Sequence, residues 1–258
     1  MKKRSARVVV ISGSTSGIGK ALAEMYRQSG DTVIGMARTA VGDDIAVDVT
    51  DTEALIRAVD GVGQKYGRID TVIACAGAGL SGATELLPTE DIERQIDLNF
   101  TGAVTLAQAA LKYMEKGGHV AFISSACALF ALPYRAMYCA SKAAVNMAAY
   151  GLYMELKSFG IKVSTICPGD IKTEFTRNRV KRSGGGRYGD APERAAQKID
   201  SREHKRMELD RAAKKIYKHC NKCGKPLYIV GAKYRVLNFL RHVLPQKLFL
   251  NVTAKIFG

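Results

Sequence analysis

The sequence has no tryptophan and only six prolines among 258 residues. It also has no apolar run near the roughly 20 residues that a membrane-spanning helix needs. Val8–Ile11 and Leu248–Leu250 are typical of its apolar runs. With 47% apolar and 24% charged residues, the composition excludes a disordered or collagen-like chain. Length and composition together predict one large α/β domain over residues 1–258.

The sequence also lacks the pattern of a disulfide framework or a complete metal site. Cys220 and Cys223 form one Cys-x2-Cys pair, but no second pair completes a tetrahedral site, and His219 would add only a third ligand. We therefore predict no metal, with zinc or redox chemistry at this pair as the alternative. The other cysteines lie in apolar segments, where a free cysteine behaves as a small buried hydrophobe: Cys75, Cys127, Cys139 and Cys167.

Acidic residues are scarce in the last third of the chain. Residues 172–258 carry 22 Lys and Arg against 7 Asp and Glu, whereas residues 1–171 carry 17 of each, so the net charge of +15 lies entirely in the last third. Such a localised charge attracts anions, for example acidic lipid headgroups, acyl carriers or phosphates, although a solvated basic surface explains it equally well. Because no nucleic-acid reading motif accompanies these basic residues, we expect no nucleic-acid partner.

The first residues do not predict a secretory signal. Met1–Arg4 is basic, but the apolar stretch that follows ends at Ser12 and Gly13 without a small-residue cleavage site. We therefore expect a cytoplasmic protein.

Short apolar runs rich in Val and Ile alternate with longer segments of helical period. Right-handed crossovers between such elements predict a doubly wound, Rossmann-like parallel sheet with helices on both faces. The predicted strands, apolar enough to be covered on both faces, are Arg7–Ser12, Thr32–Met36, Thr71–Cys75, His119–Ser124, Lys162–Cys167 and the short Leu227–Val230. The predicted helices are 17–29, 52–65, 89–115, 137–158 and 207–219.

Two segments make up most of the basic last third. Residues 177–206 include three consecutive glycines and predict a mobile loop, either a substrate lid or a plain surface insertion. Residues 207–258 predict a helix, a short strand and a basic amphipathic extension, in which Leu, Phe and Val interleave with Lys and Arg between Tyr234 and Phe257. This extension suits either a membrane interface or a subunit contact.

A glycine-rich turn follows the first predicted strand and opens the first helix. Glycines in this position let the backbone approach a pyrophosphate, whose charge is met by the N–H groups at the helix start. The spacing is Gly-x3-Gly-x-Gly, and a turn without a ligand is the alternative. The turn predicts a dinucleotide site that includes Ser12, Gly13, Ser14, Thr15, Ser16, Gly17, Ile18 and Gly19.

The end of the second strand indicates which dinucleotide is bound. An acidic residue here would hold a ribose hydroxyl and repel a 2′-phosphate, but the strand ends with Ala37 and Arg38. A guanidinium suits the extra phosphate, so we predict NADP(H) rather than NAD(H). An ordinary surface arginine is the alternative.

Tyr138 and Lys142 lie four residues apart and so share a helix face. The ammonium can then act with a bound ribose to stabilise tyrosinate and bring the phenol toward acid/base work. Tyr153 and Lys157 have the same spacing but lie about 22 Å farther along the helix, away from the predicted crevice. Ser125 follows the fourth predicted strand, where it can donate a hydrogen bond to a substrate carbonyl.

These motifs resemble those of the short-chain dehydrogenase/reductase family from about residue 6 to 176. The resemblance implies a catalytic set of Ser125, Tyr138, Lys142 and Asn99, with Ser125 thirteen residues before Tyr138. It also implies a homodimer or homotetramer. Its remaining implied cofactor residues are Asp48 and Val49 at the adenine, Cys75, Ala76 and Gly77 beside the cofactor, and Pro168, Gly169, Ile171 and Thr173 at the carboxamide. Cys75 departs from the family pattern, which has Asn-Ala-Gly there.

The combined motifs predict an NADPH-dependent reductase that transfers hydride to a ketone or aldehyde, with the reverse oxidation using the same groups. In this hypothesis Ser125 and Tyr138 hold the carbonyl, Tyr138 supplies the proton, Lys142 positions the ribose, and Asn99 anchors a water. The basic lid and extension favour a bulky apolar or anionic carbonyl substrate, such as a lipid, a steroid or an acyl-carrier ketone. The alternative is a catalytically silent NADP(H)-binding regulatory or membrane-surface protein.

Overall fold

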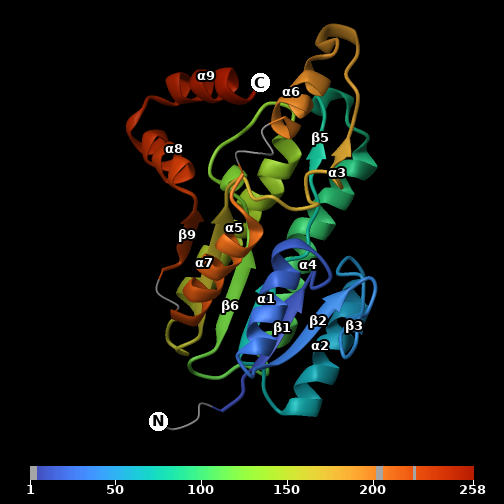
Figure 1. Ribbon diagram of the computed structural model, residues 1–258, viewed down its shortest axis with the longest axis vertical. Coiled ribbons are helices and arrows are strands. Elements are labelled where there is room, and N and C mark those ends of the chain that lie inside the picture. Colours follow the sequence, from blue (N-terminus) through green and yellow to red (C-terminus); the bar gives the residue numbers. More distant parts are fainter. Residues whose placement is uncertain (1–4, 202–205, 223–224) are drawn as a thin grey trace.

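A seven-stranded parallel sheet forms the centre of the computed structural model, which describes residues 5–201, 206–222 and 225–258 (Figure 1). Its strand order is β3-β2-β1-β4-β6-β7-β9. The order reverses between β1 and β4, and ligands of such sheets bind outside the carboxyl ends of the strands at that point. The strands are β1 (Val8–Ser12), β2 (Thr32–Ala37), β3 (Ile45–Ala46), β4 (Thr71–Ala74), β6 (His119–Ile123), β7 (Lys162–Pro168) and β9 (Leu227–Val230).

Helices cover both faces of this sheet, as predicted. Because successive side chains of a strand point to opposite faces, Val8 and Val10 of β1 join one buried cluster and Val9 and Ile11 join the other. The first cluster packs against α2 (Thr52–Tyr66), α4 (Gly102–Leu111) and α5 (Ala136–Glu155). The second packs against α1 (Gly17–Gln28) and α7 (Leu209–Lys222).

The single helix predicted over 89–115 is divided in the structure. It consists of α3 (Thr89–Ile96), a π-helical turn over Asp97–Thr101, and α4. Gly102 begins α4 against the chain that follows β3, and a Cβ there would lie 2.6 Å from the Val49 carbonyl. The prediction missed the division because the helical period continues across the π turn, which frequently marks a functional site.

The segment 177–206, predicted as a loop, contains regular structure. Val180–Lys181 forms β8 and pairs with β5 (Leu80–Ser81), and Ala191–Asp200 forms α6. The prediction of a structureless loop was wrong for α6, whose helix starts with a proline in the first turn and buries Ala195 and Ala196. Residues 202–205 of this segment, together with Met1–Arg4 and Cys223, lie outside the described residues.

The C-terminal extension folds into two helices, α8 (Ala232–Val243) and α9 (Gln246–Phe257), at the end of the sheet that carries β9 (Figure 1). Their inner side joins a third apolar cluster, and the C-terminal Gly258 carbonyl accepts a hydrogen bond from Lys198 of α6 at 2.8 Å. On α8 the apolar Val236, Phe239 and Val243 are exposed. The membrane and subunit-contact hypotheses both remain predictions. Among the described residues, no helix has the length and hydropathy to span a bilayer.

An ion pair joins the starts of β1 and β2 and gives the fold a pH dependence. Arg7 donates to Asp31 at 2.7 Å, and Ser29 donates to the same carboxylate at 3.0 Å. Burial disfavours the charged carboxylate, but these hydrogen bonds outweigh it and lower the pKa of Asp31 to about 2.

Because the folded-state pKa of Asp31 is lowered, its contribution to stability is present above about pH 4 and is lost as the pH falls toward about 2. We expect Asp31→Asn to lower the free energy of unfolding at pH 7 by on the order of 1–2 kcal/mol and to weaken its pH dependence between about pH 4 and 2. Urea unfolding at several pH values measures both effects. Asp43→Asn, which changes an exposed carboxylate in the loop after β2, is the control, and equal behaviour of the two variants would contradict this assignment.

Candidate functional site

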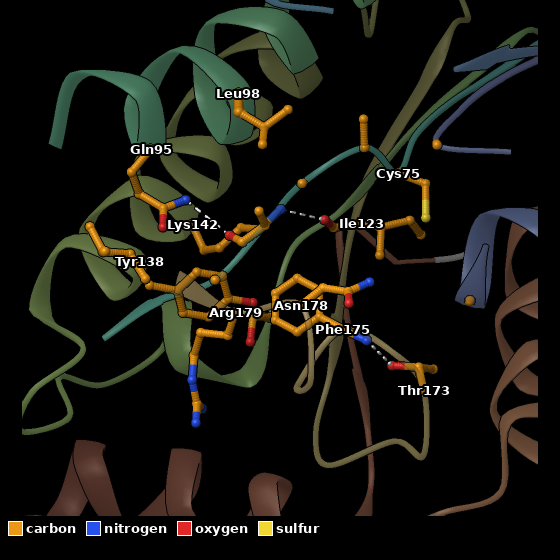
Figure 2. Close-up of a pocket in the computed structure, with 18 of the residues that line it drawn as sticks. Cys75, Gln95, Leu98, Ile123, Tyr138, Lys142, Thr173, Phe175, Asn178 and Arg179 are labelled. Carbon is orange, nitrogen blue, oxygen red and sulfur yellow. Dashed lines mark hydrogen bonds between the residues drawn. The ribbon is translucent and has the colours of Figure 1, made fainter. Parts of the chain in front are cut away.

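A cavity of about 1040 Å³ lies at the carboxyl ends of the strands, where the strand order reverses. Its wall is formed by the glycine turn after β1, the ends of β2, β4, β6 and β7, the start of α5, and the segment that follows β7. Figure 2 shows the ring of Tyr138, from α5, next to the ring of Phe175, from that segment. The topology therefore brings together, in one cavity, motifs that are far apart in the sequence.

The glycine turn is shaped for close approach of another backbone. Gly13 has a φ of +69°, and a Cβ on it would lie 3.0 Å from backbone atoms of Ala76. A Cβ on Gly19 would overlap the Gly13 carbonyl. Only glycine satisfies both positions without movement, because it has no Cβ and tolerates positive φ. The first turn of α1 thus lies at the cavity wall, where the N–H groups of Gly17 and Ile18 suit a phosphate, while the Gly19 N–H bonds to the Cys75 thiol.

Ser12 links this turn to the end of β4. Its hydroxyl accepts hydrogen bonds from the backbone N–H groups of Cys75 at 3.0 Å and Ala76 at 3.1 Å. Cys75 stands where the resembled family has an asparagine, and burial raises the pKa of its thiol to about 12, so the thiol is neutral. Ser12 therefore holds the backbone of Cys75 and Ala76 in place, although Ser12 itself does not line the cavity.

Ser14 also lies behind the cavity wall. Its hydroxyl donates to Asp44 at 3.0 Å, and the same carboxylate accepts from Arg27 at 2.5 Å and from the Gly35 N–H at 3.0 Å. A Cβ on Gly35 would overlap the Asp44 carboxylate, so this glycine is needed for the contact. Ser14 thus fixes the turn to the β2 side, a positioning role that the sequence did not reveal.

The residues predicted at the adenosine end come together at one end of the cavity. Arg38 lines it directly after β2, and Asp48 and Val49 line it after β3. Hydrogen bonds from Thr50, together with the positive charges of Arg38 and Arg94, lower the pKa of Asp48 against a smaller opposing effect of burial. The carboxylate is therefore ionised and available to accept hydrogen bonds.

Ser125 and Tyr138 lie together at the other end. Ser125 follows β6, and its hydroxyl accepts from the Cys127 N–H at 3.1 Å while also sharing a hydrogen bond with Tyr138. Burial is the largest cause of a raised pKa for Tyr138, and the Ser125 hydrogen bond and the charge of Arg135 oppose it. The phenol is therefore protonated at neutral pH, as a proton donor must be.

Lys142 lies one turn along α5 from Tyr138 and is 4% exposed. Its ammonium donates to the Ile123 carbonyl at 3.1 Å, drawn as a dashed line in Figure 2. Burial lowers the pKa of Lys142 to about 8. The ammonium also lies next to Gly77, on which a Cβ would come within 3.2 Å of the Lys142 nitrogen. A side chain at position 77 would therefore crowd the Lys142 ammonium, and glycine avoids this contact.

Asn99 lies in the π turn and is fully buried, behind the residues that line the cavity. Its amide accepts from the Ala78 N–H at 2.9 Å and donates to the Ala78 carbonyl at 3.0 Å and to Ser141 at 3.1 Å. These bonds brace the chain after β4 against α5. Its predicted role as a water anchor stays a prediction.

Apart from Ser12, Ser14 and Asn99, every residue predicted for catalysis or cofactor binding lines the cavity. The sequence analysis missed others that also line it, because Arg135 stands just before α5 outside the Tyr-x3-Lys motif, and the rest come from the segment after β7 and from α8, where no motif applies. Tyr234 of α8 is one of these residues, and its ring packs on Gly169 while its hydroxyl donates to Asp170 at 2.5 Å. The others that bear on the substrate are Arg135, Phe175, Arg179 and Arg206.

Comparison with known proteins identifies the same family that the sequence motifs resemble. The model of the short chain dehydrogenase family matches residues 7–184. The chain is 37% identical over 180 residues to the 3-ketodihydrosphingosine reductase of Bacteroides thetaiotaomicron, covering 67% of each protein. It is 31% identical over 218 residues to the 3-oxoacyl-[acyl-carrier-protein] reductase FabG of Thermotoga maritima, covering 75% of this chain and 88% of that protein.

Solved structures share the fold over nearly the whole chain. A short-chain dehydrogenase from Streptomyces avermitilis has a TM-score of 0.82 at 27% identity, covering 97% of this chain and 96% of its own. A short chain dehydrogenase from Burkholderia cenocepacia, solved in complex with NADP, has a TM-score of 0.76 at 22% identity, covering 95% and 97%. The second likeness concerns the fold alone.

The geometry of the glycine turn predicts the effect of a single methyl group. Because a Cβ on Gly19 would overlap the Gly13 carbonyl, Gly19→Ala should distort the turn and weaken dinucleotide binding at least about tenfold. Titration of cofactor fluorescence measures the dissociation constant. Gly61→Ala in α2, where no atom lies within 4 Å of the added Cβ, is the matched control and should bind as the parent does. Unchanged binding by Gly19→Ala would rule out this turn as the dinucleotide site.

Proposed function

Because the chain belongs to the short-chain dehydrogenase family, we propose that it is an NADPH-dependent reductase that transfers hydride to a ketone or aldehyde. The family assignment makes it an NAD(P)-dependent oxidoreductase. The choice of NADPH, the substrate and the residue roles are the proposal. The observation that carries it is the shared cavity, in which the glycine turn lies at one end and the Ser125–Tyr138 pair at the other.

The residues present fit a bound dinucleotide. Gly13, Gly19 and Gly77 all line the cavity, and a Cβ on any of them would press against neighbouring protein atoms, so glycine at these positions lets the wall take the shape that a dinucleotide can approach closely. When bound, the cofactor supplies the hydride. Lys142, with its ammonium beside Gly77, is placed to hold the nicotinamide ribose, and Thr173 faces the turn near Gly17.

Tyr138 and Ser125 are placed to handle the substrate oxygen. Ser125 donates a hydrogen bond as negative charge develops on that oxygen, and Tyr138 delivers its proton to it. The raised pKa of the buried phenol keeps that proton in place until it is needed. After transfer, the positive charge of Lys142 favours the tyrosinate, which then recovers a proton from solvent.

Arg38 supports NADPH as the cofactor. It follows β2 at the adenosine end of the cavity, with Ala37 in the place where an acid would exclude a 2′-phosphate. The Burkholderia cenocepacia neighbour was solved with NADP, which supports a nicotinamide dinucleotide as the cofactor of this chain. The two relatives named above reduce ketones according to their names, which supports a carbonyl substrate here.

The wall near Tyr138 supports a substrate with a substantial apolar part. The Phe175 ring lies 5.7 Å from the Tyr138 ring, centre to centre, and Leu80, Leu98 and Ile199 also line the cavity. A catalytically silent NADP(H)-binding regulator would not require Ser125, Tyr138 and Lys142 to converge. Their convergence favours an enzyme.

The proton donor gives the most direct test. Tyr138→Phe should lower kcat for NADPH-dependent carbonyl reduction by about 100-fold or more while NADPH still binds, because only the transferable proton is removed. Tyr153→Phe, in the second Tyr-x3-Lys pair, is the control and should keep the parent rate. Steady-state rates and cofactor titration give both quantities. A near-normal rate in Tyr138→Phe would refute the proposed mechanism.

The cofactor preference is tested separately at the end of β2. The double variant Ala37→Asp/Arg38→Leu should shift the ratio of kcat/KM for NADPH over NADH by at least about tenfold toward NADH, because it removes a phosphate ligand and adds a carboxylate for the ribose. Arg57→Leu on α2, with a side chain 69% exposed, should leave the ratio unchanged. If the double variant keeps the parent ratio, Arg38 does not read the 2′-phosphate.

A further inference from the structure

Three arginines line the substrate end of the cavity: Arg135, Arg179 and Arg206. None was singled out by a sequence motif, and the reaction proposed above uses none of them. Arg135 directly precedes α5, three residues before Tyr138, while Arg179 and Arg206 belong to the chain after β7. The positive charges of Arg135 and Arg206 both act on Arg179, so Arg179 lies within electrostatic reach of each.

Arg179 is nearly buried and incompletely paired. Its side chain is 5% exposed, and its Nε has no hydrogen-bond partner among the described residues. Its ion pair is with Asp200 at 3.4 Å, but that carboxylate lies closer to Lys181, at 2.8 Å. Burial and the neighbouring arginines lower the pKa of Arg179, against the opposing effect of Asp200. A buried guanidinium with a free donor is costly unless a ligand completes its bonds.

The other two arginines do not balance this charge. The Nε of Arg135 is also buried without a partner among the described residues. Arg206 is 8% exposed and donates to neutral oxygens, the Thr176 hydroxyl at 3.0 Å and the Ile199 carbonyl at 2.9 Å. Two acids of this segment line the wall: Glu174 is paired with Arg177, and Asp170 keeps its charge but accepts a hydrogen bond from Tyr234. Asp170 and the shared Asp200 therefore face four cations, the three arginines and Lys181. The cluster therefore carries an excess of positive charge.

The backbone holds Arg179 beside the reacting end of the cavity. The Val180 N–H donates to the Gly79 carbonyl at 2.9 Å. The stem of Arg179 then crosses Gly79, where a Cβ would lie 3.0 Å from its Cγ and 3.3 Å from the Phe175 ring. Because Phe175 contacts Tyr138, the stem of Arg179 lies beside the predicted proton donor, and Figure 2 shows its guanidinium extending away from the two rings.

The cofactor phosphates do not account for this cluster. The 2′-phosphate is assigned to Arg38 after β2, and β2 and β7 are four strand spacings apart in the sheet, or about 19 Å. The pyrophosphate is assigned to the turn after β1, which is three spacings from β7. By contrast, Arg182 lines the cavity but is already paired with Asp91 through two hydrogen bonds.

We propose that the carbonyl substrate carries an oxyanion, either a carboxylate or a phosphate, and that Arg179 and Arg135 bind it while Arg206 adds positive charge. This inference rests on the proposed reductase function and names the substrate class for the same site. The guanidinium donors suit either oxyanion, since both accept paired hydrogen bonds. The apolar wall holds the part of the substrate between its carbonyl and its anionic end.

Three aldehydes of similar size test the proposal: 4-formylbenzoate, its neutral methyl ester, and 4-formylphenyl phosphate. With saturating NADPH, we expect kcat/KM for at least one anion to exceed that for the ester by at least about tenfold. The acid and the phosphate distinguish the two oxyanions. A ratio near one for both anions, with the ester reduced, would overturn the anion site and leave the reductase function intact.

Variants of Arg179 test whether the arginine cluster causes the preference for the anionic aldehydes. Arg179→Gln should bring the ratio of anion to ester close to one, and Arg179→Lys should retain part of it, which covers the case in which the glutamine variant does not fold. Arg187→Gln removes a charge from the same segment outside the cavity, with a side chain 76% exposed, and should keep the parent ratio. A parent ratio in both Arg179 variants would overturn the assignment.

A binding experiment separates this inference from the reductase function. If no aldehyde is reduced although NADPH binds, the reductase proposal fails, and calorimetric titration with benzene-1,4-dicarboxylate in the presence of NADP⁺ tests the anion site alone. Binding that is weakened at least about tenfold in Arg179→Lys or Arg179→Gln supports the site. No binding, or equal binding by parent and variants, overturns it.

Discussion

The contact between the turn after β1 and the end of β4 is the constraint on which the rest of the site depends. Two backbones meet here at van der Waals distance, because Gly13 has no Cβ to separate it from Ala76. The Ser12 hydroxyl then satisfies both N–H groups that β4 leaves unpaired as it ends. This contact shapes the crevice at the point where the strand order reverses. It also sets the direction in which the N-terminus of α1 points. A change that separates these strands would displace both ends of the site together.

The same contact explains how the chain tolerates Cys75 in place of the family's asparagine. The backbone after β4 is held from one side by Ser12 and from the other by the Asn99 amide, which bonds to both the N–H and the carbonyl of Ala78. The neutral Cys75 thiol lies beside Gly19 and accepts a hydrogen bond from its backbone N–H. Support that would have come from a side-chain amide is supplied by its neighbours, and Gly77 can still bring the backbone close to Lys142.

The sequence predicted the sheet and most of the cavity because both depend on local signals. Apolar strands, a glycine turn and a Tyr-x3-Lys pair each act over a few residues, and parallel topology then brings their ends to one edge. The same reasoning failed over 89–115, where a π turn interrupts a continuous helical period, and over 191–200, where α6 is short and its only large apolar side chain is Ile199. Arg135, Arg179 and Arg206 could not be found from the sequence, because an arginine's burial and pairing depend on contacts between distant segments.

The two ends of the cavity differ in whether local motifs or contacts between distant segments form them. Local motifs specify the end of the cavity proposed for the cofactor. The end proposed for the substrate is built from the start of α5, the segment after β7 and Tyr234 of α8, which packs on Gly169 and bonds to Asp170. The C-terminal extension therefore does more than cover the sheet edge, since it fixes the chain that carries Arg179. The basic character of the last third has a specific consequence at this point, because buried guanidinium groups place part of that charge inside the cavity, where solvent screens it least.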